Sequence, residues 1–412
     1  MSWGLPGPRV LAVSAVTFVV ALGAFQALNG AAQPAPGRAA DADALIKQGN
    51  DGLQRARETA DPAQYARAQA AFGQALQRDP RSVDATIGMA TLALARHDFR
   101  GGLRHAQRAR HLEPKLARPF SVLVDAQLEL GRYEQAGRAL QQMIDLRPSL
   151  ASYARVSYFR ELHGDLTGAA RAMRLAVSTG AAAPENVAYV QTQLGDLEAT
   201  RGHVRSARRA YRAALAGVVG YVPALAGRAR LDAAQGRSGR AIRDLEAIVR
   251  RRPLPEYAIA LGETQWAAGR RADARETFAL VDAQRRLLAA NGVNSDVEIA
   301  LFEADHGDRR RAVVLARRAW RAAPSVRSAD AVGWTLTRSG RSNEGLRWAR
   351  RALKLGSRDP LLLTRAGLSA RAAGRDREAR RYLRHALRAN SRFSAVWAPR
   401  AREALRALTR GA

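Results

Sequence analysis

One dipeptide recurs along most of this chain at nearly constant spacing. A glycine followed by arginine, histidine or aspartate stands at Gly131, Gly164, Gly202, Gly236, Gly269, Gly307, Gly340 and Gly374. The intervals between these glycines are 33 or 34 residues, except for two intervals of 38. Self-similarity at this period is typical of proteins built by stacking one supersecondary unit, so the register constrains the fold more than any single motif does.

An apolar helical face follows each recurring glycine. A small residue stands five positions after the glycine, and apolar residues follow it at four and seven positions, as in Ala136, Leu140 and Met143. This spacing places the three side chains on one side of a helix. Prolines where the units end, such as Pro80 and Pro114, extend the same register backwards. The sequence therefore predicts ten such second helices.

A first helix precedes each of these, marked by a small residue twelve positions before the alanine. The clear cases are Ala90, Gly195, Gly262, Ala300, Gly333 and Gly367. A side chain this small lets two helices approach closely, and the recurring glycine supplies the left-handed residue of a tight turn. The two intervals of 38 residues leave about one helical turn to spare, which indicates either two unrelated loop extensions or a duplicated block.

The pattern resembles the tetratricopeptide repeat (TPR) family, and an exported bacterial type in particular. Units of that family carry small residues at positions 8, 20 and 27, a large residue at 24 and proline at 32, and the match covers about residues 41–390. The family's tryptophan at position 4 is missing, with Phe120 and Tyr153 there in two units. The resemblance implies an all-α, right-handed solenoid of about ten hairpins, whose first helices line a concave groove, and members that commonly act as protein-interaction scaffolds.

Both ends of the chain depart from the repeat. Residues 1–32 contain an uncharged stretch from Val10 to Leu28, which predicts either a cleaved signal peptide or an uncleaved signal-anchor. Residues 33–40 are expected to form a linker of Pro, Gly and Ala, and everything after it is expected to lie outside the cytoplasm. Residues 391–412 are expected to form a capping helix with Ala401, Ala404, Leu405 and Leu408 on one face.

Catalytic and metal chemistry find little support in the sequence. Cysteine is absent, which excludes disulfides and thiolate metal sites. The nearest arrangement to a metal site is His306 with Glu303, Asp305 and Asp308, in a turn where polar residues are ordinarily solvated. No phosphate-binding loop, nucleophile elbow or zinc-protease helix is present. We therefore predict no enzyme, no cofactor and no bound metal.

The formal charge of +30 is carried almost wholly by arginine, and nearly all of it falls on the second helices. Pairs such as Arg309-Arg310 and Arg350-Arg351 would then point outward from the convex side. This charge has two interpretations. The face binds an anionic membrane surface or envelope polymer, or it is only the solvated face of an arginine-rich protein. Nucleic acid is a less favoured partner because the repeats are expected outside the cytoplasm.

The groove side differs from the convex side because acidic and aromatic residues gather there in the middle units. By the geometry that the resemblance implies, the groove candidates are Glu256, Glu263, Trp266, Asn294, Glu298, Asp305, Arg327, Asp330 and Trp334. Tryptophan beside carboxylates is a plausible hot spot for a basic or aromatic peptide, although both tryptophans could instead be packed beneath a neighbouring hairpin. We expect a non-catalytic interaction scaffold of the cell envelope or exterior that binds a protein or peptide in this groove.

Overall fold

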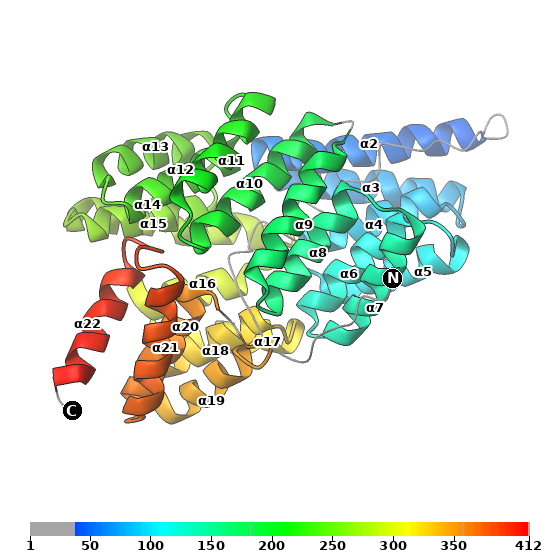
Figure 1. The fold of residues 1–412 in the computed structure, drawn as a ribbon. Coiled ribbons are helices and arrows are strands. Elements are labelled where there is room, and N and C mark those ends of the chain that lie inside the picture. The colour runs from blue at the N-terminus through cyan, green and yellow to red at the C-terminus, as the bar shows by residue number, and fades with distance from the viewer. Residues whose placement is uncertain (1–37, 182, 357, 411–412) are drawn as a thin grey trace.

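The computed structural model describes residues 38–181, 183–356 and 358–410, and within these ranges every regular element is a helix. The 21 helices, α2 to α22, follow one another as ten hairpins and a final single helix (Figure 1). This arrangement confirms the predicted all-α array of about ten hairpins with a C-terminal capping helix.

Each hairpin begins with a first helix and ends with a second helix. The first helices are α2 (Arg38–Thr59), α4 (Val83–Ala95), α6 (Arg118–Glu129), α8 (Leu150–Leu162), α10 (Pro184–Thr200), α12 (Val222–Ala234), α14 (Pro255–Ala267), α16 (Asp296–His306), α18 (Val326–Arg338) and α20 (Pro360–Ala372). The second helices are α3 (Ala63–Arg78), α5 (Phe99–Leu112), α7 (Tyr133–Leu146), α9 (Leu166–Thr179), α11 (Val204–Gly217), α13 (Ser238–Arg251), α15 (Arg271–Ala290), α17 (Arg309–Ala322), α19 (Ser342–Ala352) and α21 (Asp376–Ala389). The capping helix is α22 (Trp397–Arg410).

Small residues on the first helices receive large side chains from the second helices. The ring of Tyr211 lies against Gly195 in its own hairpin and against Gly227 in the next one. A Cβ atom at Gly195 would lie 2.4 Å from a ring carbon of Tyr211, and one at Gly227 would lie 2.5 Å away. One large side chain therefore joins two consecutive hairpins, as the alternation of small and large residues in the sequence predicts.

The two sets of helices differ in how much of their surface is buried. In the first helix α18, ten of the thirteen residues are buried, whereas the second helix α13 buries only a stripe of four. Second helices are thus on the outside, where arginines such as Arg250, Arg309 and Arg350 are exposed. The outward position predicted for the basic second-helix face is therefore correct for these residues.

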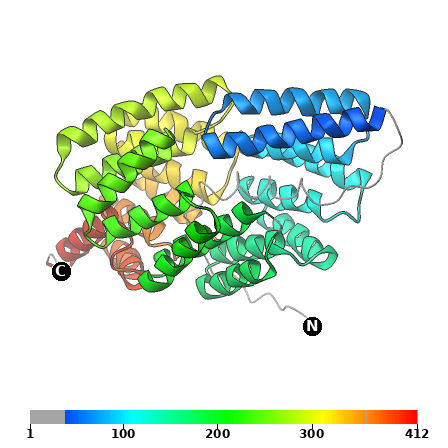
Figure 2. The same cartoon turned by 90° about the horizontal axis from the view of Figure 1, so that it is seen from above.

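The array is wound so tightly that one superhelical turn contacts the next. The Asn294 N–H donates to the carbonyl oxygen of Arg96 (3.0 Å), and the Asn390 side chain donates to the carbonyl oxygen of Ala199 (2.7 Å). Partners in such inter-turn contacts are about 190 to 220 residues apart, which is roughly six repeat units. From above, α2 and α3 lie beside the helices of the seventh hairpin (Figure 2).

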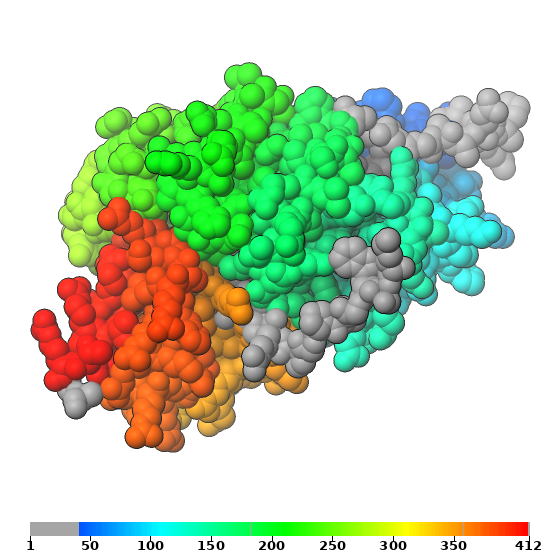
Figure 3. Space-filling view, viewed as in Figure 1, coloured from blue at the N-terminus to red at the C-terminus, as the bar shows by residue number. Residues whose placement is uncertain are grey.

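The inter-turn contacts join the turn inside one hairpin to the connection that precedes a later hairpin. The backbone N–H of Val326, at the start of α18, donates to the hydroxyl of Tyr133 at the start of α7 (2.8 Å). Gly131, with a φ of +68°, approaches so closely that a Cβ atom there would lie 2.3 Å from the carbonyl oxygen of Pro324. The space-filling view shows the end of the second turn abutting α10 and α11 (Figure 3).

The N-terminal predictions concern residues that the structure mostly does not describe. The expected signal peptide or signal-anchor, residues 1–32, lies wholly outside the described residues, and α2 already begins at Arg38 inside the range expected to be linker. Among the helices that are described, none has the length and apolar character needed to cross a membrane.

Candidate functional site

The inner face of the superhelix is formed by first-helix side chains that are deep in the coil yet reached by solvent. We define it by Glu161, Asp196, Arg230, Glu256 and Glu298, which lie on α8, α10, α12, α14 and α16. Arg230 pairs with Asp196 at 3.3 Å and still exposes 47% of its side chain. Because successive turns are in contact, the inner face is closed along the side where the resemblance to TPR proteins implies an open groove.

Two inner-face carboxylates have no cationic partner. Neither Glu161 nor Glu256 forms an ion pair with any residue that the structure describes. Burial raises the pKa of Glu161 to about 8, with a further contribution from the negative charges of Asp359 and Asp196. Burial likewise raises the pKa of Glu256 to about 7, and the charge of Glu298 adds to it. The charges of Arg230 and Arg252 act in the opposite direction on Glu256 but do not outweigh burial, so the inner face holds two carboxyl groups whose charged form is disfavoured.

Of the predicted groove residues, Glu256, Asn294, Glu298 and Arg327 lie together. Glu256 and Glu298 line one cavity, and Arg327 donates to Glu298 at 2.6 Å. Asn294 borders this cavity, where its carbonyl oxygen contacts the Nδ1 atom of His97. Asn294 thus holds two superhelical turns together through its backbone.

The other predicted groove residues are engaged within the protein. Glu263 lies 3.6 Å from His306, and the guanidinium of Arg271 stacks 3.8 Å above the ring of Trp266. Trp266 also meets His306 edge-on, with 5.9 Å between the ring centroids. These contacts occupy parts of both side chains but leave them partly exposed.

Asp305, Asp330 and Trp334 are part of the packing between hairpins. The indole N–H of Trp334 donates to Asp305 (3.0 Å), and Arg365 donates to Asp330 (2.6 Å). Trp334 is 4% exposed and packs against Trp397 of α22. For Trp334 the structure therefore agrees with the packed alternative, because the capping helix covers a ring that the groove geometry would expose.

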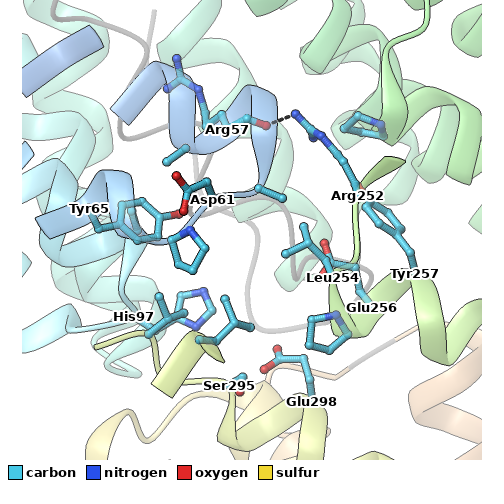
Figure 4. Close-up of a pocket in the computed structure, with 18 of the residues that line it drawn as sticks. Arg57, Asp61, Tyr65, His97, Arg252, Leu254, Glu256, Tyr257, Ser295 and Glu298 are labelled. Carbon is cyan, nitrogen blue, oxygen red and sulfur yellow. Dashed lines mark hydrogen bonds between the residues drawn. The ribbon is translucent and has the colours of Figure 1, made fainter. Parts of the chain in front are cut away.

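A cavity of about 170 Å³, the inter-turn pocket, lies where α2 to α4 meet the next superhelical turn (Figure 4). Its lining residues are Ala56, Arg57, Ala60, Asp61, Pro62, Tyr65, Ala95, His97, Glu185, Asn186, Tyr189, Tyr221, Pro223, Arg252, Leu254, Pro255, Glu256, Tyr257, Leu288, Val293, Ser295 and Glu298. The pocket thus combines tyrosine, proline and aliphatic walls with a few charged groups, which is the usual composition of a ligand site.

Both repeats of unusual length contribute their additional residues to the inter-turn pocket. The first helix α10 has 17 residues where most first helices have about 13, and its additional N-terminal turn carries Glu185 and Asn186. The second helix α15 has 20 residues where most second helices have 14, and it is followed by Val293 and Ser295. The extensions lengthen different helices rather than loops, and they converge in space on one cavity.

A strained residue also lies at this pocket. His97 occupies the turn position that glycine holds in the following units, and it has a φ of +59°. A left-handed conformation is unfavourable for a residue with a side chain, and such strain clusters at functional sites. Here the inter-turn contact with Asn294 holds His97 in place.

The charged groups of the pocket are unequally satisfied. Arg252 donates to the carbonyl oxygens of Arg57 and Glu58, and Arg57 lies 3.9 Å from Glu185. The carboxylate of Glu256, in contrast, has no described partner apart from its own backbone N–H. Arg252 and Arg57 thus each have partners in the protein, although the Nη1 atom of Arg57 is buried without a hydrogen bond, whereas Glu256 has no side-chain partner among the described residues.

Metal chemistry gains no support from the geometry. Within the described ranges, no group of three or more His, Asp or Glu residues is placed to hold a metal ion. His306 lies in an aromatic cluster with Phe278 and Phe302, while Glu303 accepts from the Asp308 backbone and pairs with Arg311 (3.1 Å). The four residues of the possible site named from the sequence thus have separate structural roles.

Comparisons with known proteins give similarities to solved structures. No protein-family model matches the sequence, and no curated protein matches it. Among solved structures, the chain is similar to the TPR domain of P58(IPK), at 16% identity over 90% of this chain and 98% of that one, with a TM-score of 0.25. It is also similar to the thermophilic TPR protein TTC0263 of Thermus thermophilus (17% identity, 44% and 94% covered, TM-score 0.40). A third such structure is PilF of Pseudomonas aeruginosa (20% identity, 52% and 94% covered, TM-score 0.38).

The fold is decided by the repeat itself. Ten hairpins share one register, and in most of them a left-handed glycine joins two helices. Large second-helix side chains such as Phe72 and Tyr211 pack on small first-helix residues. The chain has a TPR-like helical-repeat fold. In this TPR-like array, consecutive superhelical turns are in direct contact.

Proposed function

We propose that this chain is a non-catalytic scaffold for protein interactions, whose inner face holds a basic segment of another protein. The observation that carries the proposal is that two inner-face carboxyl groups, Glu161 and Glu256, form no ion pair with a described residue and have raised pKa values. A bound lysine or arginine would remove the penalty that now raises the pKa of each group. Closure of the inner face between turns restricts such a partner to an extended segment that enters along the superhelix axis.

Two further features support a binding role. In the described part of the chain, no acid, base and nucleophile converge in the way that a catalytic site requires. The uncharged stretch from Val10 to Leu28 supports export, so that we place the scaffold in the cell envelope or outside the cell.

A selection from a library of displayed peptides tests the proposal. Wild-type protein is expected to enrich basic sequences, and the double variant E161Q/E256Q is expected to lose that enrichment. Both substitutions keep the side-chain volume, and E134Q provides a matched control because Glu134 is exposed on the second helix α7. Enrichment of the same peptides by wild type and E161Q/E256Q would show that the inner-face carboxylates do not select the partner.

A second candidate function concerns the outer face. Arg250, Arg309 and Arg310 are exposed there, and none of them forms an ion pair with a described residue. Such a face fits an anionic membrane surface or envelope polymer. Sedimentation with anionic vesicles should then weaken steeply with added salt and with the change R309Q/R310Q. Binding that is independent of salt, or no binding at all, would remove this candidate.

A further inference from the structure

The inter-turn pocket is built from parts of the chain that the hairpin register alone does not require. The additional turn of α10 and the extension after α15 both end at its wall, and His97 is held there in a strained conformation. A plain stacking of equal repeats needs neither extension. The pocket is therefore built by departures from the hairpin register, and it lies where one of them, at Asn294, also joins the two superhelical turns.

The walls of the pocket suit an aliphatic stem with a cationic end. Tyr65, Tyr257 and Leu254 surround the space into which the carboxylate of Glu298 points (Figure 4). Tyrosine rings attract cations over their faces and cover apolar chains at their edges. Aliphatic and aromatic contacts of this kind favour a ligand with a short hydrocarbon part.

The charges of the pocket decide the sign of the ligand. Arg252 is bound to backbone carbonyl oxygens, Arg57 lies beside Glu185, and Glu298 is paired with Arg327. Glu256 is the carboxylate that remains, and it accepts nothing beyond its own backbone N–H among the described residues. Four carboxylates and two arginines line the pocket, so an anionic ligand would meet an excess of negative charge, whereas a cation would supply the missing partner of Glu256.

The pocket has room for a small group. Its volume of about 170 Å³ is close to the roughly 150 Å³ of an engineered cavity that holds benzene, a molecule of six heavy atoms. An alkylammonium of five or six heavy atoms fits this volume, and so does the end of a lysine side chain.

We propose that the inter-turn pocket binds a protonated amine or guanidinium on a short aliphatic stem, with Glu256 as the counter-ion and the tyrosine rings around the stem. The amine has two possible sources, namely a free small molecule or a basic side chain of the segment bound to the inner face. The second source rests on the proposed function, whereas the first does not.

Binding of n-pentylamine, measured by isothermal titration calorimetry on the full chain, tests this inference. The protein should bind n-pentylamine and should not bind n-pentanol or pentanoate, which share the stem but lack the positive charge. The variant E256Q should lower the affinity at least tenfold, and E263Q should leave it unchanged because Glu263 lies outside the pocket on the same helix. Equal binding of n-pentanol, or full affinity of a folded E256Q protein, would overturn the inference.

The pH dependence provides a second readout. Groups that face Glu256 are Glu298 on α16, Arg230 on α12, Arg252 after α13, Tyr257 on α14 and Tyr65 on α3. Because burial raises the pKa of Glu256 to about 7, the affinity for the amine should rise about 30-fold from pH 5.5 to pH 8. In E256Q this rise should be lost, because the titrating counter-ion is removed. An affinity that falls with pH in the wild-type protein would contradict the assignment.

A competition experiment distinguishes the two sources of the amine. If n-pentylamine displaces a basic peptide obtained from the peptide selection, the pocket receives a side chain of the bound segment. If both bind together, the pocket belongs to a free amine and the proposed scaffold function stands separately. Failure of n-pentylamine to bind the wild-type protein would overturn the pocket inference even when the peptide binds, so the two proposals can fail independently.

Discussion

The buried ion pair between α6 and α8 allows a quantitative test of how neighbouring hairpins are joined. Arg155 is 0% exposed and donates from Nε and Nη2 to the two carboxylate oxygens of Asp125, at 2.9 and 2.6 Å. It also donates to the carbonyl oxygens of Ser121 and Ala151, at 3.1 and 3.0 Å. The pKa of Asp125 is about 6, raised by burial although Arg155 lies against it.

The two single substitutions, D125N and R155M, are expected to differ in cost. D125N leaves a buried guanidinium that cannot lose its proton, so the loss should be about 3 kcal/mol, the lower end of the usual 3–5 kcal/mol because two backbone acceptors remain. R155M leaves a carboxyl group whose pKa is already about 6 and rises further without the guanidinium. That group can take up a proton, so R155M should cost about 1–2 kcal/mol at pH 7 and less at pH 5.5.

Amide hydrogen exchange in α6 and α8 measures this difference, because a repeat array need not unfold in one step. A loss of about 3 kcal/mol corresponds to roughly 100-fold faster exchange through local opening in D125N. R155M should show a smaller increase that shrinks at lower pH, after correction for the intrinsic exchange rate. If R155M is as damaging as D125N, or is insensitive to pH, the asymmetry argued from proton uptake is wrong.

Three further predictions concern the turns, the capping helix and pH. G131A should loosen the inter-turn contacts and increase the radius of gyration in solution scattering, because its Cβ atom would meet Pro324. Gly374 has a φ of +69° and open space around it. G374A should therefore lower the free energy of unfolding by only about 1 kcal/mol. W397A should cost about 3–5 kcal/mol locally and expose α22 to proteolysis, because Trp397 is 4% exposed; an unchanged cleavage pattern would contradict this. The native state holds a proton on Glu256 between pH 4.5 and about 7 that the unfolded chain lacks, so wild type loses stability as pH rises through this range. E256Q should therefore melt higher than wild type at pH 8 and equally at pH 5, and equal melting at both values would refute the raised pKa.

The hairpins were predictable from the sequence because their determinants are local. A glycine in the turn of most hairpins, a small residue on the first helix and an apolar stripe on the second helix repeat in one register. Gly195 and Tyr211 show that these signals correspond to real contacts. The capping helix was predictable for the same reason, although it begins at Trp397 rather than at the start of the range 391–412.

The contacts between superhelical turns were not predictable from the sequence in the same way. They depend on the sum of small rotations between successive hairpins, which no single residue determines. This explains why Asn294 binds another turn instead of facing an open groove. Trp334, placed in the groove by its register position, is covered for a different reason, because α22 lies beyond the last repeat and outside its register.

Two signals of the pocket were nevertheless present in the sequence. The intervals of 38 residues marked the extensions of α10 and α15, but their convergence could be seen only in three dimensions. The second signal is His97, which stands 34 residues before Gly131 in a position where a glycine is expected. A side chain at a left-handed turn position indicates that something outside the hairpin holds it there.

The contact between superhelical turns also limits how such a chain can vary in length. In an open solenoid, each unit touches only its neighbours, so units can be gained or lost with little effect on distant ones. Here the removal of one unit between Arg96 and Asn294 would rotate everything beyond it by about one sixth of a revolution and bring different residues opposite each other. The number of units between the two contact points therefore determines which residues meet across the turns, just as the side chains there do.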